Sequence, residues 1–272
     1  MPLRLTPTLR DVLAAQRASS SPRALAGIWA CTGSPLVAEI CAGSGLDWVL
    51  IDMEHSPNGL ADVLAQLQAV ASYPVTSVVR VPIGDTVTIK QVLDLGAQTV
   101  LVPMVSSAAQ AAELVADVRY PPHGRRGVGS ALARSARWNR VDDYLADADR
   151  HVSLLVQIET AEGVAAAAEI AAVDGVDGVF VGPSDLAASM GVLGQQTHPD
   201  VVAAVHRAFD AVRAAGKPVG VNAFDPAVAD AYIAAGASFV LVGADVTLLA
   251  RGSEALAARF VPGDDAAPRA GY

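Results

Sequence analysis

The sequence predicts an α/β protein folded as one parallel eight-stranded (β/α)8 barrel, the TIM barrel. Three observations support this prediction. Eight short apolar runs recur along the 272 residues, and each is followed by an Ala-rich amphipathic stretch. No internal stretch is rich enough in Pro, Gly or Ser to divide the chain, whose length suits a single barrel. A doubly wound open sheet is the structural alternative.

The first half of the chain contains four of the predicted strands. They are apolar at nearly every position, as expected for a parallel sheet covered by helices. These strands are Ala24–Ala30, Trp48–Met53, Ser77–Val81 and Thr99–Val105. The helical patterns of this half are Leu60–Ser72, Ile89–Leu95 and Ala108–Val118.

The second half repeats the pattern. Its strands are Ser153–Ile158, Gly178–Val181, Pro218–Asn222 and Phe239–Val242. Its helical patterns are Ala161–Ala171, Pro199–Ala215 and Pro226–Ala235. Several helices run into a glycine, in DLGAQ, AAGKP and AAGAS, where a left-handed residue can end the helix before the next strand.

The barrel is expected to occupy residues 1–260, including an amphipathic N-terminal helix. Residues 261–272 lack periodicity and are expected to form a disordered tail. The longest stretch without periodicity inside the barrel is Tyr120–Arg140, which we interpret as an active-site loop rather than a linker.

Composition excludes several classes of partner. The chain has 28 Asp and Glu against 19 Lys and Arg, a formal charge of −9, so a basic nucleic-acid-binding surface is not expected. No run approaches the roughly 18 apolar residues of a membrane span, and the N-terminus lacks signal-peptide features, so we expect a cytoplasmic protein. Cys31 and Cys41 match no zinc pattern and are expected to be buried thiols.

Polar residues gather where several predicted strands end, which is the mouth of a parallel barrel. The second strand ends in the run Asp52 to His55, the third carries Arg80, the fifth ends in Gln157-Ile158-Glu159, and Gly182-Pro183-Ser184-Asp185 follows the sixth. Each has a structural alternative. His55 could be a surface-loop residue, Arg80 a salt-bridge partner, and Asp185 the cap of a helix starting at Leu186.

Two carboxylates at this mouth could bind a divalent cation. Gln157 and Glu159 are two apart on a strand and so project to the same face, while Asp185 comes from the next strand. Carboxylate oxygens without a nearby histidine or cysteine cluster favour a hard ion such as Mg²⁺ or Mn²⁺. The alternative is a carboxylate pair that forms an ion pair with Arg80.

The lysines make an imine mechanism improbable. Lys90 and Lys217 are the only lysines of the sequence, and neither lies where a strand ends at the mouth. A metal would then have to polarise the substrate carbonyl. No GxxxxGK[ST] or GxGxxG motif indicates a nucleotide cofactor.

The sequence resembles the HpcH/HpaI aldolases from about Gly27 to Arg251. The matching segments are GIWACTGSPLVAEICAGSGLDWVLIDMEHSP, VVRVP, LVPMVSSAAQA, YPPHGRRGVG, QIETAEGV, GVFVGPSDLAASMG and FVLVGADVTLL. These are metal-dependent pyruvate aldolases typified by 4-hydroxy-2-oxoheptanedioate aldolase. The resemblance implies a barrel of the phosphoenolpyruvate/pyruvate-domain type and a homohexamer, a trimer of dimers that exchange a C-terminal helix.

The resemblance also implies a metal and substrate site. Glu159 and Asp185 would hold Mg²⁺, Mn²⁺ or Co²⁺, and Gln157 would contact the substrate, as would Trp29 in the first segment. The backbone amides of Ser184 and Asp185 would bind the pyruvate carboxylate at the start of a helix. Relatives often carry Ala or Asn at the position of Ser184, which matters little for a backbone contact.

Three further residues match the catalytic positions of the family. His55 would be the base, Asp94 its carboxylate partner, and Arg80 would stabilise the enolate oxygen. Asp94 could instead be a solvated helix-end carboxylate or a partner of Arg80. Asn222 stands where many relatives have an apolar residue, which leaves the aldehyde specificity open.

The expected activity is reversible cleavage of a 4-hydroxy-2-oxo acid to pyruvate, or a hydroxypyruvate-like 2-oxo acid, and an aldehyde. The partners would be small molecules, with no nucleic acid or membrane. A CoA-thioester lyase or an oxaloacetate decarboxylase would use the same metal–enolate chemistry. A noncatalytic acid-binding barrel is the alternative from a different class.

Overall fold

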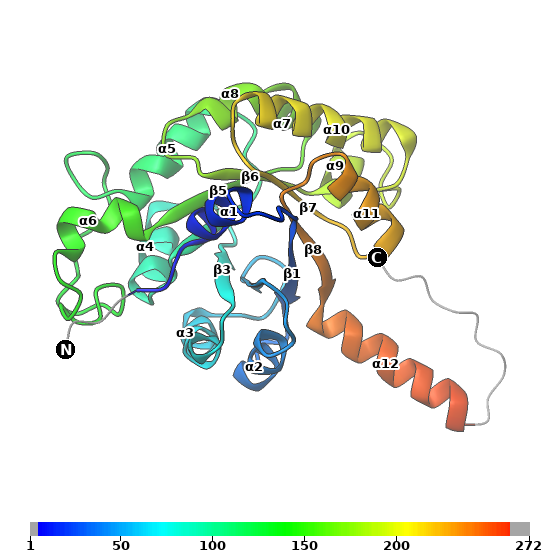
Figure 1. The fold of residues 1–272 in the computed structure, drawn as a ribbon, viewed down its shortest axis with the longest axis horizontal. Coiled ribbons are helices and arrows are strands. Elements are labelled where there is room, and N and C mark those ends of the chain that lie inside the picture. The colour runs from blue at the N-terminus through cyan, green and yellow to red at the C-terminus, as the bar shows by residue number, and fades with distance from the viewer. Residues whose placement is uncertain (1–4, 262–272) are drawn as a thin grey trace.

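A computed structural model describes residues 5–261, and in it eight parallel strands close into a barrel (Figure 1). The strands are β1 (Leu25–Ala30), β2 (Trp48–Asp52), β3 (Thr76–Arg80), β4 (Thr99–Val102), β5 (Ser153–Ile158), β6 (Gly178–Val181), β7 (Val219–Asn222) and β8 (Phe239–Ala244). Because β1 also pairs with β8, the sheet has no open edge. The barrel prediction is confirmed, and the open sheet is excluded. Apart from Val261, the predicted tail lies outside the described residues.

Helices alternate with the strands around the barrel. They are α1 (Leu9–Arg17), α2 (Pro35–Ala42), α3 (Leu60–Ala69) with the 3-10 turn η1 (Val70–Ser72), α4 (Thr86–Asp94), α5 (Ala108–Val118), α6 (Tyr144–His151), α7 (Ala161–Ala165), α8 (Ala167–Ala172), α9 (Pro183–Ser189), α10 (Pro199–Ala214), α11 (Pro226–Ala234) and α12 (Asp245–Phe260). The periodic patterns named from the sequence did not include α2, α6 or α12, although the family resemblance implied a C-terminal helix. Within residues 5–261, no helix has the length and apolar character needed to cross a bilayer.

Alternate residues of each strand face the barrel interior. On β5, Leu155 belongs to the interior cluster, whereas Leu154 and Val156 pack outward against the helices. Two glycines make room for interior aromatic rings. A Cβ added at Gly27 would lie 2.3 Å from the Trp48 indole. A Cβ added at Gly220 would lie 2.4 Å from the Phe239 ring. The interior is therefore a packed core that ends in polar side chains at the mouth.

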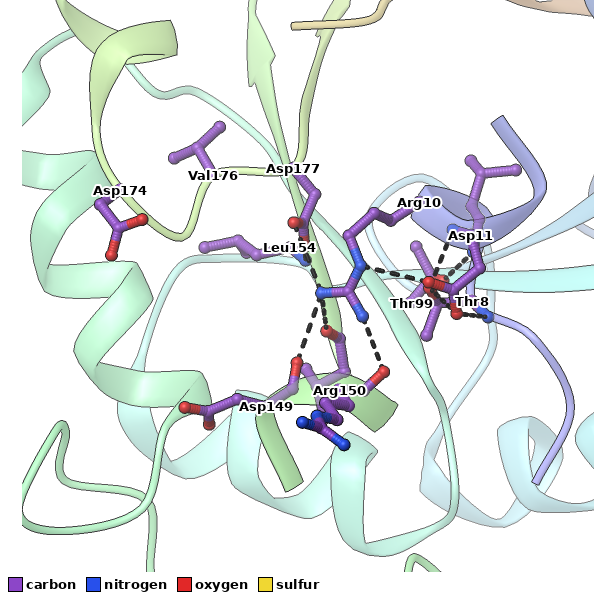
Figure 2. A network of polar contacts seen from close by, with 12 residues as sticks. Thr8, Arg10, Asp11, Thr99, Asp149, Arg150, Leu154, Asp174, Val176 and Asp177 are labelled. Atoms are coloured by element: carbon purple, nitrogen blue, oxygen red, sulfur yellow. Dashed lines mark hydrogen bonds and ion pairs between the residues drawn. The ribbon is translucent and has the colours of Figure 1, made fainter. Parts of the chain in front are cut away.

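Helix α1 packs against the N-terminal end of the barrel, beside the starts of β4 and β5 (Figure 2). Thr8 and Asp11 form a capping box at its start, and the Leu9 amide donates to Thr99 Oγ1 at the base of β4 over 3.0 Å. The Arg10 guanidinium donates to the carbonyl oxygens of Asp149, Arg150 and Val152. These contacts tie α1 to the segment that precedes β5.

The interpretation of Tyr120–Arg140 as an active-site loop of its own barrel is wrong. This segment leads from the end of α5 towards α6 and the start of β5, so it lies at the N-terminal end of the barrel. It packs against the end of α4, where the Arg134 amide donates to the Asp94 carbonyl oxygen over 3.0 Å. Its length and polarity did not distinguish a loop before a strand from one after it.

We expect Gly27→Ala to destabilise the barrel by about 1–3 kcal/mol, because the new methyl group would overlap the buried Trp48 ring. Gly243→Ala on the adjacent strand β8 is the matched control, since an added Cβ there would meet no atom within 4 Å. Urea unfolding of both variants measures the difference. Equal stability of the two variants would contradict this account of the core.

Candidate active site

A buried ion pair connects β2 and β3 at the mouth. Asp52 and Arg80 are register partners at the ends of these strands. Arg80 Nε and Nη2 donate to the two Asp52 carboxylate oxygens over 2.7 and 2.8 Å, and Nη1 lies 2.7 Å from Glu54 Oε2. Both Asp52 and Arg80 are almost fully buried. The bidentate geometry therefore holds the guanidinium in one orientation.

Asp52 also organises the loop that carries His55. Its carboxylate accepts hydrogen bonds from the backbone amides of Glu54 and His55, over 3.0 and 3.2 Å. Its carbonyl oxygen accepts from Asn58 Nδ2 over 2.6 Å. The His55 side chain is 66% exposed, and its Nε2 lies 3.9 Å from Glu54 Oε1. The histidine thus extends into solvent from a fixed backbone.

Trp29, at the end of β1, packs against Arg80. The guanidinium carbon lies 4.2 Å from the centre of the indole ring, a cation–π distance. Indole Nε1 donates to Asn222 Oδ1 over 2.8 Å. The structure therefore brings the predicted residues Trp29 and Arg80 together, and it adds Asn222 to them.

Gln157 and Glu159 face the same side of β5, as predicted, and are in contact. Gln157 Nε2 donates to Glu159 Oε2 over 2.6 Å, and the backbone amide of Met104 donates to Oε1 over 2.7 Å. Met104 has a φ of 59°, in the left-handed region that non-glycine residues rarely adopt. The predicted strand through Val105 therefore ends early, at Val102, and the turn brings this amide to Glu159.

Burial raises the pKa of Glu159 to about 7. The hydrogen bonds from Met104 and Gln157 oppose this rise, while the negative charges of Glu54 and Asp185 add to it. Among the residues described, Gln157 Oε1 is buried and has no hydrogen-bond partner. A Cβ at Gly182 would lie 2.8 Å from Glu159 Oε2, so glycine leaves this space to the carboxylate. The pocket has buried oxygen acceptors and excess negative charge, which suits a cation.

Ser184 and Asp185 lie in the first turn of α9, which begins at Pro183 and not at Leu186 as expected. Asp185 is therefore not the helix cap, and its side chain is exposed beside the mouth. The first amides of a helix have no acceptor within that helix, so those of Ser184 and Asp185 can bind an anion. No group of three or more His, Cys, Asp or Glu side chains within residues 5–261 is arranged to bind a metal. A cation here would have two protein carboxylates and other oxygen ligands.

The structure does not bring Asp94 to His55 within one chain. Asp94 is the last residue of α4, so it lies at the N-terminal end of the barrel, whereas His55 follows β2 at the mouth. Its carboxylate lies 3.5 Å from Nη2 of the buried Arg126. The alternative in which Asp94 pairs with Arg80 is also wrong, because Arg80 binds Asp52 and Glu54.

The mouth has one buried cationic side chain, Arg80, and a separate group of carboxylates. Within the described part of the chain, neither Glu159 nor Asp185 forms an ion pair with Arg80, so the structural alternative for these carboxylates is not supported. Lys217 lies before β7, where its Nζ donates to the Val176 carbonyl oxygen over 2.6 Å, and Lys90 lies on α4. Arg80 on one wall can bind negative charge on a substrate directly. The pocket of Gln157 and Glu159 on the other wall could do so through a bound cation.

Sequence reasoning placed Asp52 and Glu54 in the polar run at the mouth but assigned them no role. It missed Met104, and it named Asn222 without its contact to Trp29. Counting every second residue back from the strand ends would have placed Asp52 and Asn222 on the interior face. No sequence signal indicated the left-handed Met104, because its conformation depends on the turn.

The model of the HpcH/HpaI aldolase/citrate lyase family matches residues 25–252, which include all eight strands and the residues of the mouth. The chain belongs to this family. The resemblance seen in the sequence is confirmed, and the membership identifies the chain as an enzyme of the carbon–carbon lyase class.

Two curated relatives of this HpcH/HpaI chain are similar over nearly their whole length. The 4-hydroxy-2-oxo-heptane-1,7-dioate aldolase of Salmonella dublin is 55% identical over 86% of this chain and 89% of that protein. The hydroxypyruvate/pyruvate aldolase of Deinococcus radiodurans is also 55% identical, over 86% of this chain and 84% of that protein. Among solved structures, an HpcH/HpaI family protein from Burkholderia cenocepacia J2315 has a TM-score of 0.86 and 40% identity, covering 92% and 98% of the two chains.

We expect Glu159→Gln to stabilise the metal-free protein at high pH. The pKa of Glu159 is 4.5 in the unfolded chain and about 7 in the folded protein. The wild type therefore loses folding free energy as pH rises from 4.5 to 7, and the loss is constant above pH 7. The loss is about 3 kcal/mol, and the amide variant would not show it. Urea unfolding in chelator at pH 5 and pH 8 measures this difference. Glu162→Gln, at an exposed position on α7, is the control; the same pH response from both variants would contradict the prediction.

Proposed function

We propose that this family member catalyses the reversible aldol cleavage of a 4-hydroxy-2-oxo acid into a 2-oxo acid and an aldehyde. The 2-oxo acid would be pyruvate or a hydroxypyruvate-like acid, in line with the names of the two curated relatives. The observation that carries the proposal is the buried, bidentate orientation of Arg80 at the same mouth as the Gln157–Glu159 pair.

Glu159 and Asp185 would bind a divalent cation, Mg²⁺, Mn²⁺ or Co²⁺. The fit rests on the raised pKa of the buried Glu159, on the unpartnered Gln157 Oε1 and on the space that Gly182 leaves beside the carboxylate. Such a cation would polarise the 2-oxo group and stabilise negative charge on its oxygen.

The chain's own residues would orient the substrate and move the proton. The amides of Ser184 and Asp185 would bind the substrate carboxylate at the start of α9. His55 would remove the proton from the C4 hydroxyl, so that the C3–C4 bond breaks and the aldehyde leaves. Arg80 would bind the enolate oxygen until C3 is protonated.

We expect activity to require a divalent cation. Chelation followed by dialysis should abolish aldol cleavage, and Mg²⁺, Mn²⁺ or Co²⁺ should restore it, because neither lysine lies at the mouth to form an imine. Pyruvate formation measures the activity. Full activity of the chelated enzyme, with borohydride trapping a pyruvate adduct on Lys90 or Lys217, would rule out the metal proposal.

Substitutions at two positions separate the base from the electrostatic group. His55→Ala should slow proton transfer by on the order of 10²–10⁴-fold. Arg80→Ala should also slow the reaction, because the charge that stabilises the enolate is lost. Arg80→Lys should restore little of this activity, because an ammonium cannot make the bidentate contact with Asp52. Exchange of the pyruvate C3 protons in deuterated water, followed by NMR, measures both. Exchange at the wild-type rate in either alanine variant would remove that residue from the mechanism.

We propose that the chain forms an oligomer through α12, with a second copy covering this helix. Figure 1 shows α12 extending away from the barrel. Of this fully described helix, only Asp245 is buried, while Leu249 is 65% and Phe260 70% exposed. Exposed apolar side chains along one helix are typical of an interface. A hexamer built from dimers that exchange this helix is the assembly that we propose.

In such an assembly, Asp94 could reach His55 only from another protomer, because the two lie at opposite ends of one barrel. We expect His55→Ala and Asp94→Asn each to lower activity, and hetero-oligomers of the two variants to regain part of it, because some sites then combine an intact His55 with an intact Asp94. Co-expression with two affinity tags and an aldol assay test this. No recovery in a verified hetero-oligomer would return Asp94 to a structural role with Arg126.

A further inference from the structure

The side chain of Asn222 lies at the mouth and takes no part in the chemistry proposed above. Asn222 ends β7, two residues after Gly220, whose added Cβ would meet the interior ring of Phe239. Val219 and Val221 pack outward with the helices. By the alternation of the strand, Asn222 therefore faces the interior, and it is half-buried there.

The hydrogen bond from Trp29 determines how the Asn222 amide is oriented. An indole N–H only donates, so the atom 2.8 Å from Trp29 Nε1 must be the carbonyl oxygen of the amide. The NH₂ group then points away from Trp29. It donates to no residue within the described range 5–261 and is accessible from the mouth. The site therefore contains an oriented donor with two free N–H bonds.

Trp29 itself cannot move freely. Its ring packs under the Arg80 guanidinium at 4.2 Å and meets the edge of the Phe180 ring at a centroid distance of 6.5 Å. Arg80 is in turn held by Asp52. The position of the Asn222 donor is thus determined by a chain of contacts that begins at a buried ion pair.

The position of Asn222 around the barrel indicates which part of the substrate it meets. The proposed cation ligands come from β5 and from α9, which follows β6, and Trp29 comes from β1. Asn222 ends β7, which lies in the barrel between β6, the strand that leads into α9, and β8, which pairs with β1. A 2-oxo acid bound at α9 would place the carbons derived from the aldehyde next to this amide.

We propose that Asn222 is a specificity-determining residue that donates a hydrogen bond to a hydroxyl group on the aldehyde part of the substrate. This inference rests on the proposed aldolase function. An aldehyde without the hydroxyl would leave the donor unpaired in a half-buried position, which disfavours it. The preferred aldehydes are therefore hydroxylated rather than purely aliphatic.

The test compares glycolaldehyde with propanal, which has a methyl group in place of the hydroxyl. Pyruvate is the donor for both, and kcat/KM is measured for each aldehyde in each protein. The ratio of the two values cancels effects on the cation, the 2-oxo acid and the base. We expect Asn222→Leu to lower the wild-type ratio by about tenfold, the effect of one lost hydrogen bond. Asn222→Ala leaves room for water at the Trp29 indole and should lower the ratio by a similar factor. It replaces the leucine variant in the test if that variant does not fold.

Trp29→Phe tests whether Asn222 acts by donating to the substrate or only by accepting the hydrogen bond that holds Trp29 in place. This variant removes the indole N–H but keeps the Asn222 donor, so its ratio should fall much less than that of Asn222→Leu. An unchanged ratio in both Asn222 variants, or an equal fall in Trp29→Phe, would overturn the inference. In either case, cation-dependent exchange of pyruvate C3 protons by the wild type would leave the aldolase proposal standing. Absence of both exchange and aldol addition in the wild type would instead reject the proposed function.

Discussion

The ion pair between Asp52 and Arg80 is the interaction on which the rest of the mouth depends. Removing Arg80 would leave the Asp52 carboxylate buried without its cationic partner, which is costly in free energy. The pair is possible because β2 and β3 are in register at these residues and both side chains face the interior. Asp52 accepts from Arg80 on one side and from the Glu54 and His55 amides on the other. One carboxylate therefore positions the guanidinium and the loop that carries the proposed base.

The opposite wall of the mouth has the reverse electrostatic character. Glu159 is only 2% exposed, accepts two hydrogen bonds and still has a pKa near 7, because burial and the carboxylates of Glu54 and Asp185 outweigh them. Burying an ionised carboxylate in an apolar barrel interior costs free energy of folding. The proposed cation would offset this cost, so the features that raise the pKa of Glu159 are those that would give the site affinity for a metal.

The two ends of the barrel have different roles. The N-terminal end is covered by α1, which is held by its capping box and by the bonds of Arg10 to backbone carbonyl oxygens. The mouth instead exposes the side chains of His55 and Asp185. Asp94 and the segment Tyr120–Arg140 belong to the first end of their own chain. Neither therefore lies where it could act at the mouth of its own barrel.

The sequence alone determined the barrel, because continuous apolar runs alternating with amphipathic stretches can be buried in few other ways. It also determined that Gln157 and Glu159 share a face, since the alternation of side chains on a strand requires no tertiary information. Only the tertiary structure decided which partner each polar residue has. Arg80 could have paired with Glu159, Asp185 or Asp94, and the register of β2 and β3 selected Asp52. The Met104 amide at Glu159 and the Asn222 oxygen at Trp29 depend likewise on contacts between strands far apart in sequence, which residue patterns along the chain do not encode.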